Sequence, residues 1–443
     1  MPDNIPLIKK VDFHDETLNT IHQVVRKTDS KIVYFIIDGL GDLPIEGDSE
    51  KRTILQKENF KNLNWLAENG SCGTSIACWP PMPVGSGEGH LSLFGYNPIN
   101  FPIGRGVIES LGADADIETN DIGIRINLAT QNKDGIVVDR RAGRIPTEKT
   151  NKLVELLNKK IRIDIPEMKN VKLVIQTSLE HRIAVVLKGG DLGGDVQDTD
   201  PGKNGMPLNE IAVLYKPGED YSSSMRTAKI LRELSRQITE ILRSKEARDI
   251  VGDNNNANVP LFRGIGKYHY MPKMKEVFKL DACAICPTPA YKGVAKAIGM
   301  DVLPVGPNLE DQLDVYRKNF NKYTFLFVHF KLTDKYGENG DIENKTKAFK
   351  MADSIVREFL NPEPDIFFVG GDHSTPASIV KGHSGDPVPF IFYSPKGRVR
   401  KDNVRRFDEI SCSCGAMGTN LPAYAIIMPS ALEFSGKLRK FEN

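Results

Sequence analysis

The feature that most constrains this chain is an order of segments found at both of its ends: an apolar strand, a polar or glycine-rich loop, and an amphipathic helix. Near the start, residues 31–37 form a continuous apolar run that stops at Asp38, and residues 60–69 have helical apolar periodicity before Gly70. A continuous apolar run is typical of a parallel strand buried on both faces. This end of the chain therefore predicts an α/β protein.

The C-terminal part repeats this order. The pattern predicts strands over residues 323–330, 365–369 and 388–393, and an amphipathic helix over residues 342–360. Since both ends have the same strand–loop–helix order, we expect them to complete one α/β sheet.

The middle of the chain has a different pattern. It predicts a hairpin over residues 121–138, strands over 173–175 and 182–187, a helix over 225–242 and a loop over 252–258. A chain of 443 residues is too long for one ordinary core. We therefore expect a core domain of residues 1–116 and 263–443, with a second domain of residues 117–262 inserted into it.

Charge and hydropathy exclude several classes of protein. The net charge is +1, which gives no overall field that would attract nucleic acid or an anionic membrane. No apolar run is long enough to span a bilayer, and residues 1–10 lack the apolar region of a secretory signal. We expect a cytoplasmic protein with neither nucleic acid nor membrane as a partner. The oligomeric state stays open, a homo-oligomer included.

The six cysteines do not indicate a metal or redox site. Cys283 and Cys286 lie in an apolar segment, which favours a buried strand. Cys412 and Cys414 have the wrong spacing for a zinc knuckle and no matching second half, so we expect them to be structural.

Carboxylate and imidazole side chains occur in the loops that end the predicted strands. Asp38 follows the first strand, Asp372 and His373 follow strand 365–369, and His383 lies in the next glycine-rich loop. This mixture of ligands suits Mn²⁺, Zn²⁺ or Co²⁺, and Mg²⁺ less well. Each residue alone would be interpreted as a loop side chain or a helix cap. Their co-occurrence predicts two divalent ions that clamp a phosphoryl group.

Two further carboxylates follow strand 323–330. Asp334 and Glu338 are four residues apart, which can bring both to one side of a turn. For Glu338 the alternative is an ordinary polar loop leading into the next helix, and the sequence does not decide between the two.

Ser86 is the candidate nucleophile. Gly85 and Gly87 flank it and allow the backbone to approach a phosphate closely. The segment from Glu88 to Phe94 can begin a helix, whose N-terminal amides would favour a phosphoryl dianion. A metal on the hydroxyl oxygen would activate it at neutral pH. A Gly-Ser-Gly triplet alone is usually a turn, so this prediction depends on the partner residues.

Anion-binding candidates lie mostly in the middle of the chain. Arginine binds carboxylate or phosphate bidentately, which fits a small doubly anionic substrate, although a surface role is the default for any single arginine. Asp198 and Asp200 form either an Asx turn or a polar wall of the site, with equal support. The basic candidates are Arg105, Arg125, Arg140, Arg141, Arg144, Arg182, Arg263 and Lys292.

In this order the motifs resemble those of the cofactor-independent phosphoglycerate mutases of the archaeal type, within the alkaline phosphatase superfamily. The resemblance runs from about Ile32 onward. It rests on Asp38-Gly-Leu-Gly-Asp42, Gly85-Ser86 through Tyr96, Gly104-Arg105-Gly106, Asp139 through Arg144, Glu180-His181-Arg182, Asp198 through Pro201, Arg263-Gly264, Tyr291-Lys292-Gly293, Gly371 through Pro376 and His383 through Asp386.

The resemblance implies an alkaline-phosphatase-like three-layer α/β core with an inserted α+β cap domain. It implies interconversion of 3-phosphoglycerate and 2-phosphoglycerate in glycolysis and gluconeogenesis, without a bisphosphoglycerate cofactor, through a phosphoserine at Ser86. Substrate would be bound by Arg105, Asp139, Arg140, Arg182, Arg263 and Lys292. One metal would be held by Asp38, Ser86, Asp372 and His373, and the other by Asp334, His383 and the residue at position 338.

The sequence departs from the family pattern at several motifs, including the stretch after Arg52, which lacks the usual Thr-Pro start. Related bacterial mutases have His where this chain has Glu338, and the usual Tyr-Asp-Pro is Tyr96-Asn97-Pro98 here. The main alternative is a metal-dependent phosphatase or phosphonate hydrolase on the same core. A sugar-phosphate mutase and a non-catalytic metal- or phosphate-binding protein are further alternatives.

Overall fold

A computed structural model describes residues 11–215, 217–218, 220–252, 256–378 and 382–441 of the chain. It divides into two compact units. The first comprises Met1–Phe101, Pro272–Pro287 and Ile298–Asn443, and the second comprises Pro102–Met271 and Thr288–Ala297. Residues 102–116, 263–271 and 288–297, which the sequence analysis assigned to the core domain, thus group with the second unit.

The first unit is built on a mixed eight-stranded sheet. Its strands are mainly parallel, and β13 is antiparallel to both of its neighbours. In order across the sheet they are β10 (Asp301–Val302), β9 (Ala282–Ile285), β11 (Phe325–Phe330), β1 (Ile32–Ile37), β12 (Ile366–Gly370), β13 (Val388–Tyr393), β2 (Ser71–Ile76) and β14 (Leu421–Pro422).

Strand β1 lies at the centre of this sheet. All six of its residues are buried, as the continuous apolar run predicted. It pairs in parallel with β11 on one side and β12 on the other, with Ile37 opposite Phe330 and Ile36 opposite Gly370. The carboxyl ends of the three strands therefore meet at one edge, which is where open α/β sheets bind ligands.

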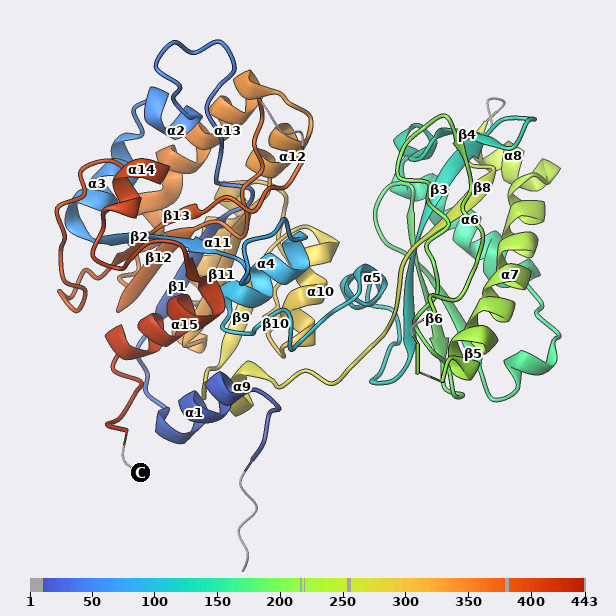
Figure 1. Cartoon of the computed structure of the whole chain (residues 1–443), viewed down its shortest axis with the longest axis horizontal. Coiled ribbons are helices and arrows are strands. Elements are labelled where there is room, and N and C mark those ends of the chain that lie inside the picture. Colours follow the sequence, from blue (N-terminus) through green and yellow to red (C-terminus); the bar gives the residue numbers. More distant parts are fainter. Residues whose placement is uncertain (1–10, 216, 219, 253–255, 379–381, 442–443) are drawn as a thin grey trace, which may run out of the picture. The chain divides into compact units, whose positions relative to one another are not determined.

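Helices cover both faces of this sheet (Figure 1). On one face, Phe35 and Val328 join a core with Leu66 of α3 and Phe349 of α13. That layer comprises α3 (Lys61–Asn69), α11 (Leu309–Asn319), α13 (Ile342–Ile355) and α14 (Glu409–Ser413). On the other face lie α4 (Ser86–Leu93) and α15 (Ala423–Phe434), where Phe94 contacts Phe327 and Phe434 contacts Phe392. The predicted α/β class with a three-layer core is confirmed.

The shorter elements of this unit lie around the sheet. The helix predicted over residues 342–360 ends at Ile355 and continues as a tighter 3₁₀ segment. Residues 332–338, where the sequence allowed a turn or a polar loop, form a helix. These elements are α1 (Glu16–Val24), α2 (Ile54–Lys57), α9 (Met274–Val277), η3 (Phe320–Lys322), α12 (Leu332–Glu338) and η4 (Val356–Leu360).

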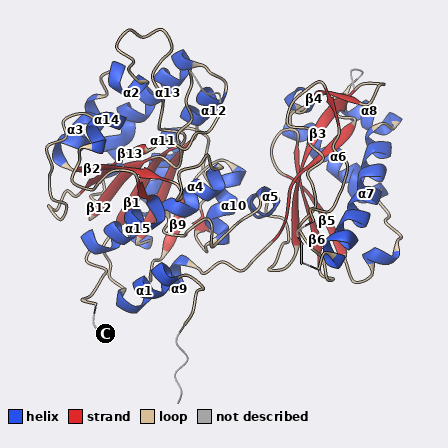
Figure 2. Cartoon of the chain, in the orientation of Figure 1, coloured by secondary structure: helices blue, strands red, loops and turns tan. Residues whose placement is uncertain are grey.

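The second unit contains an antiparallel sheet with β3 at its centre (Figure 2). The hairpin predicted over residues 121–138 is confirmed by the pairing of β3 with β4. The strand order is β5 (Lys172–Thr177), β6 (Arg182–Lys188), β3 (Ile122–Gln131), β4 (Ile136–Asp139) and β7 (Met206–Pro207), with β8 (Val259–Lys267) also paired to β3.

Successive side chains along β3 point to opposite faces of this sheet, and the two faces pack against different elements. Ile122, Ile124 and Ile126 share a core with Leu157 and Leu234 of the helices on one face. Those helices are α6 (Thr147–Lys160), α7 (Ser222–Leu242) and α8 (Lys245–Val251). Helix α5 (Arg105–Gly112) packs on β3 and β8, and α10 (Pro289–Ala297) packs on α5. Two 3₁₀ turns, η1 (Ala142–Arg144) and η2 (Pro166–Met168), complete the unit.

Close contact between α5 and α10 explains why residues 288–297 group with the second unit. A Cβ on Gly293 would lie 2.0 Å from the carbonyl oxygen of Ile108, and one on Gly112 would lie 1.9 Å from that of Pro289. Two glycines thus let the helix backbones approach, a feature that periodicity in the sequence does not reveal.

No helix in the part of the chain that the structure describes has the length and apolar character needed to cross a bilayer.

We predict that Gly293→Ala destabilises the second unit. The new methyl group would overlap the Ile108 carbonyl, and overpacking of this kind typically costs about 1–3 kcal/mol. Gly266→Ala is a matched control, because the nearest atom to a Cβ there is 3.6 Å away. Thermal unfolding should show a lower midpoint for Gly293→Ala than for Gly266→Ala. Equal midpoints would contradict a close helix contact at Gly293.

Candidate active site

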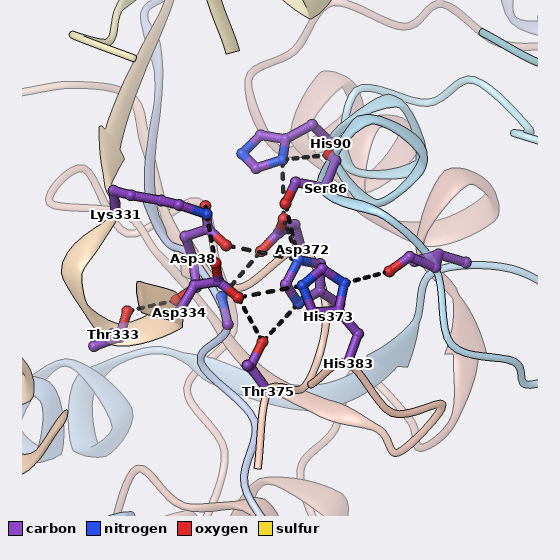
Figure 3. Close-up of polar contacts among 12 residues, drawn as sticks. Asp38, Ser86, His90, Lys331, Thr333, Asp334, Asp372, His373, Thr375 and His383 are labelled. Carbon is purple, nitrogen blue, oxygen red and sulfur yellow. Dashed lines mark hydrogen bonds and ion pairs between the residues drawn. The ribbon is translucent and has the colours of Figure 1, made fainter. Parts of the chain in front are cut away.

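The candidate site lies where β1, β11 and β12 end. Asp38 directly follows β1, Asp334 lies on α12 just after β11, and Asp372 and His373 follow β12. Figure 3 shows these side chains pointing toward one another, with Ser86 and His383 beside them. The site therefore brings together residues up to some 340 positions apart through the parallel register of three strands.

Carboxylate and imidazole atoms form two groups that share His373. In the first, His373 Nε2 lies 3.1 Å from Asp372 Oδ2 and 3.6 Å from Asp38 Oδ1. In the second, His383 Nε2 lies 3.3 Å from Asp334 Oδ1, and the His373 and His383 rings stack at 3.7 Å. Within each group the donor atoms lie within 4.8 Å of one another.

The residues of these two groups fit divalent metal ions. Asp38, Asp334 and Asp372 are buried carboxylates. The Nδ1 of His383 lies 2.6 Å from the Val84 carbonyl oxygen, to which it must donate, so Nε2 faces the carboxylates. Mixed oxygen and imidazole donors suit Mn²⁺, Zn²⁺ or Co²⁺.

Ser86 is the first residue of α4. The helix begins here, two residues earlier than the sequence predicted, with Gly85 as its N-terminal cap. The Ser86 Oγ lies 3.1 Å from His373 Nε2, the imidazole common to both groups. A Cβ on Gly89 would lie 2.5 Å from the Asp372 carbonyl oxygen, so the first turn of α4 packs directly on the loop after β12. The hydroxyl thus lies beside both free backbone amides and candidate metal ligands.

Glu338 lies at the edge of this arrangement. It is on α12 with Asp334, and its Oε1 is 3.9 Å from His383 Nε2. Its side chain is 52% exposed, and it belongs to neither group of candidate ligands. A ligand role for Glu338 therefore stays a prediction.

Three basic side chains that were not identified from the sequence contact the carboxylates. His90 Nδ1 lies 3.1 Å from Asp372 Oδ2, and His329 Nε2 lies 3.0 Å from Asp38 Oδ2. Lys331 Nζ lies 3.1 Å from Asp38 Oδ2 and 2.5 Å from Asp334 Oδ2. Their positions in the sequence could have identified them, because His90 is one helical turn after Ser86, and His329 and Lys331 flank the end of β11.

These neighbours keep the carboxylates ionised. Burial by itself raises the pKa of Asp38, but Lys331 and His329 outweigh it and hold that pKa well below its usual range. Burial and Asp38 also raise the pKa of Asp334, yet His383, Lys331 and His373 lower it to about 2. Asp334 raises the pKa of His383 to about 9 despite burial of the imidazole. The site thus has the anionic oxygens that a cation needs.

A second set of candidates gathers on the sheet of the second unit. Arg125 of β3 is opposite Arg263 of β8, and Asn127 is opposite Arg182 of β6. Arg263 and Arg140 both bind Asp200, with nitrogen–oxygen distances of 3.1 and 2.5 Å. Asp200 also accepts from the Gly202 amide at 2.9 Å, which is the contact of an Asx turn, and a place for Asp200 in a polar wall of the site stays a prediction.

Positive charge is concentrated in this set, which we call the arginine cluster: Arg105, Arg125, Arg140, Arg182 and Arg263. Burial, together with Arg182, Arg263 and Arg105, lowers the pKa of Arg125 to about 9 against the opposing effect of Glu109. The Arg182 Nε is buried and has no hydrogen-bond partner among the described residues. Clustered guanidinium groups with an unused buried donor fit an anionic ligand.

Other predicted substrate-binding residues lie outside the arginine cluster. Asp139 accepts from the backbone amides of Arg141 and Gly143 and so shapes its own turn. Arg144 pairs with Glu180. Lys292 is half-buried on α10, which packs on α5.

A serine at a helix N-terminus, beside buried carboxylates and imidazoles at the strand ends of an α/β sheet, defines a class: enzymes whose site is suited to metal-assisted phosphoryl transfer. Comparison with known proteins narrows this class. A family model described as 2,3-bisphosphoglycerate-independent phosphoglycerate mutase matches residues 67–247.

Relatives match almost the whole chain. A protein of Thermotoga maritima named probable 2,3-bisphosphoglycerate-independent phosphoglycerate mutase is 38% identical over 422 residues, covering 95% of this chain and 98% of its own. A protein of Thermus thermophilus with the same name is 39% identical over 424 residues, with the same coverage.

Solved structures agree with these relatives. A protein from Pyrococcus horikoshii has a TM-score of 0.76 and 28% identity, covering 94% of this chain and 99% of its own. A cofactor-independent phosphoglycerate mutase from Thermoplasma acidophilum has a TM-score of 0.63 and 27% identity, covering 92% of this chain and 100% of its own. The chain belongs to the family of 2,3-bisphosphoglycerate-independent phosphoglycerate mutases, which are isomerases, and the resemblance found in the sequence is confirmed.

We predict that Mn²⁺ stabilises the protein and that chelation reverses this. At a free concentration of 100 times Kd, each occupied site should add about 2.7 kcal/mol to the free energy of unfolding. Asp372→Asn should reduce the gain, since it weakens the first group of ligands. Asp353→Asn should keep it, because Asp353 only accepts from the Asn62 and Leu63 amides. Denaturant titrations with Mn²⁺ and after chelation measure the gain for the wild type and for each variant, and an equal gain in both variants would contradict the ligand assignment.

Proposed function

We propose that this chain interconverts 3-phosphoglycerate and 2-phosphoglycerate without bisphosphoglycerate, through a phosphoserine at Ser86. The observation that supports this most is the position of the Ser86 hydroxyl, 3.1 Å from the imidazole that both candidate ligand groups share. The proposal includes a role in glycolysis and gluconeogenesis in the cytoplasm.

In this proposal two divalent ions bind at the strand ends. Asp38, Ser86, Asp372 and His373 hold one of them. Asp334 and His383 hold the other, with Glu338 as a further candidate ligand. When bound, the ions supply Lewis acidity and neutralise the charge of the phosphoryl oxygens. The candidate ions are Mn²⁺, Zn²⁺, Co²⁺ and Mg²⁺.

The protein's own groups perform the transfer in two halves. The Ser86 oxygen forms a bond to phosphorus while the bond from phosphorus to the glycerate oxygen breaks. The proton that leaves Ser86 balances the one gained by the released hydroxyl. Backbone amides in the first turn of α4 bind the phosphoryl oxygens. Attack by the other glycerate hydroxyl then reverses these steps and restores Ser86.

We propose that the arginine cluster holds the glycerate between the two half-reactions, after the phosphoryl group has moved to Ser86 and before it returns. Its guanidinium groups would bind the substrate carboxylate, and glycerate kept in place recovers the phosphoryl group before water does. Asp139 and Lys292 remain candidates for the same task. A phosphatase or phosphonate hydrolase would also use Ser86, but it would need no site for a released carboxylate. The buried, unused Arg182 Nε therefore favours the mutase.

We predict that Ser86→Ala abolishes mutase activity and leaves the fold intact, since only one hydroxyl is lost. Wild-type protein quenched in acid during turnover should give a phosphorylated peptide that contains residue 86, and the variant should give none. Ser92→Ala, on the same helix, is the matched control, because Ser92 only accepts from the Tyr424 amide. Full turnover by Ser86→Ala would refute the nucleophile assignment.

We predict that Arg263→Ala raises KM far more than it changes the thermal midpoint. Loss of a hydrogen bond to a charged group typically costs about 1.5–3 kcal/mol, which is roughly 10- to 150-fold in kcat/KM. Asp200 keeps Arg140 as its partner in this variant, which limits the loss of stability. The exposed Arg236 on α7 is the control. An unchanged KM would remove Arg263 from the binding site.

A further inference from the structure

A fully buried lysine lies behind the candidate active site. Lys345 is on α13, and its side chain is 0% exposed. Its Nζ donates to Asp42 Oδ2 at 3.0 Å, to the Thr375 carbonyl at 2.8 Å and to the Gly41 carbonyl at 3.4 Å. An ammonium group has three donors, so each has an acceptor here.

The Asp42–Lys345 pair joins the loop after β1 to the loop after β12. Asp42 Oδ1 accepts from the amides of Leu43 at 2.9 Å and Ala377 at 3.1 Å. The Thr375 amide also donates to the Gly41 carbonyl at 3.1 Å. The loop after β1 carries Asp38, and the loop after β12 carries Asp372 and His373. The pair therefore fixes the relative position of the two ligand-bearing loops.

Thr375 touches a candidate ligand from each group. Its Oγ1 lies 2.8 Å from Asp334 Oδ1 and 3.0 Å from His373 Nδ1 (Figure 3). An ionised carboxylate can only accept, so the hydroxyl proton goes to Asp334. The Thr375 oxygen must then accept from an Nδ1–H of His373. This leaves the Nε2 lone pair of His373 directed at Ser86, Asp38 and Asp372.

Thr375 has no space in which to shift. A Cβ on Gly39 would lie 2.6 Å from its Oγ1, and one on Gly337 would lie 2.4 Å from its carbonyl oxygen. Gly39 also has a φ of +64°, which favours glycine. The loop after β1 and helix α12 thus enclose Thr375 from two sides.

From these contacts we propose that Thr375 is a positioning residue. It sets the tautomer of His373 and its position relative to Asp334, and the Asp42–Lys345 pair holds Thr375 in place. This inference rests on the proposed two-metal site. A role limited to stability would predict that changes at Thr375 lower the unfolding midpoint without affecting metal affinity.

The test measures Mn²⁺ affinity and stoichiometry by isothermal titration calorimetry. Thr375→Val keeps the shape and removes the hydroxyl, and we expect it to weaken Mn²⁺ binding about 10- to 100-fold. Thr375→Ser keeps the hydroxyl and should therefore retain most of the wild-type affinity for Mn²⁺. Thr346→Val is the matched control, because Thr346 on the same helix as Lys345 only donates to the Ile342 carbonyl.

A second variant tests the buried pair, and also serves if Thr375→Val fails to fold. Asp42→Leu with Lys345→Met replaces the pair by apolar side chains of similar size, a change that proteins often tolerate. We expect weaker Mn²⁺ binding here too. Lys437→Met is the control, since this fully buried lysine donates to the carbonyl and hydroxyl oxygens of Thr28.

The outcomes separate this inference from the proposed function. A wild-type protein that binds no pair of Mn²⁺ ions would overturn the two-metal site itself. A wild type that binds two ions, with Thr375→Val matching its affinity, would overturn only the role of Thr375. In the metal-free protein, ¹⁵N shifts of His373 should report the Nδ1–H tautomer in the wild type and its loss in Thr375→Val. Identical shifts would likewise overturn the role of Thr375.

Discussion

The parallel pairing of β1 with β11 and β12 is the constraint on which the rest of the first unit depends. Because Ile37 lies opposite Phe330 and Ile36 opposite Gly370, the residues after three strands emerge at one edge. A slip of one residue would turn the apolar side chains of β1 toward the wrong layers, so core packing on both faces fixes the register. The position of the candidate ligands is therefore a by-product of how the core packs.

That arrangement has an electrostatic cost, since three carboxylates are buried at the same edge. Lys331, His329 and His90 offset part of it by direct contact. Bound divalent ions would offset more of this cost, and their positive charge would also assist the phosphoryl transfer. A comparable concentration of charge of opposite sign occurs in the arginine cluster of the second unit, where burial and like charges lower the pKa of Arg125. In the proposed function, each set binds a ligand of opposite charge, which would offset this cost.

The sequence predicted the parts of this picture that are local. Asp38 and Asp372 stand out because each ends a continuous apolar run, and Ser86 because glycines flank it. Lys345 and Thr375 do not stand out, because their roles come from contacts between segments 30 or more residues apart in the sequence. Periodicity also does not show which segments group with the second unit, because the fit of α5 against α10 depends on Gly112 and Gly293. Glu338 shows a further limit of sequence-based prediction. Its spacing from Asp334 allowed a role as a metal ligand, and the exposure of its side chain leaves that role undecided.

In the proposed reaction a phosphoryl group moves between two hydroxyls of one glycerate and is not lost to water. This can be followed by ³¹P NMR of the purified protein with 3-phosphoglycerate and Mn²⁺ and with no bisphosphoglycerate. We expect the 2-phosphoglycerate resonance to grow to equilibrium, little inorganic phosphate to form, and chelation to stop the reaction. Release of inorganic phosphate without 2-phosphoglycerate, or conversion that chelation does not affect, would contradict the proposed reaction.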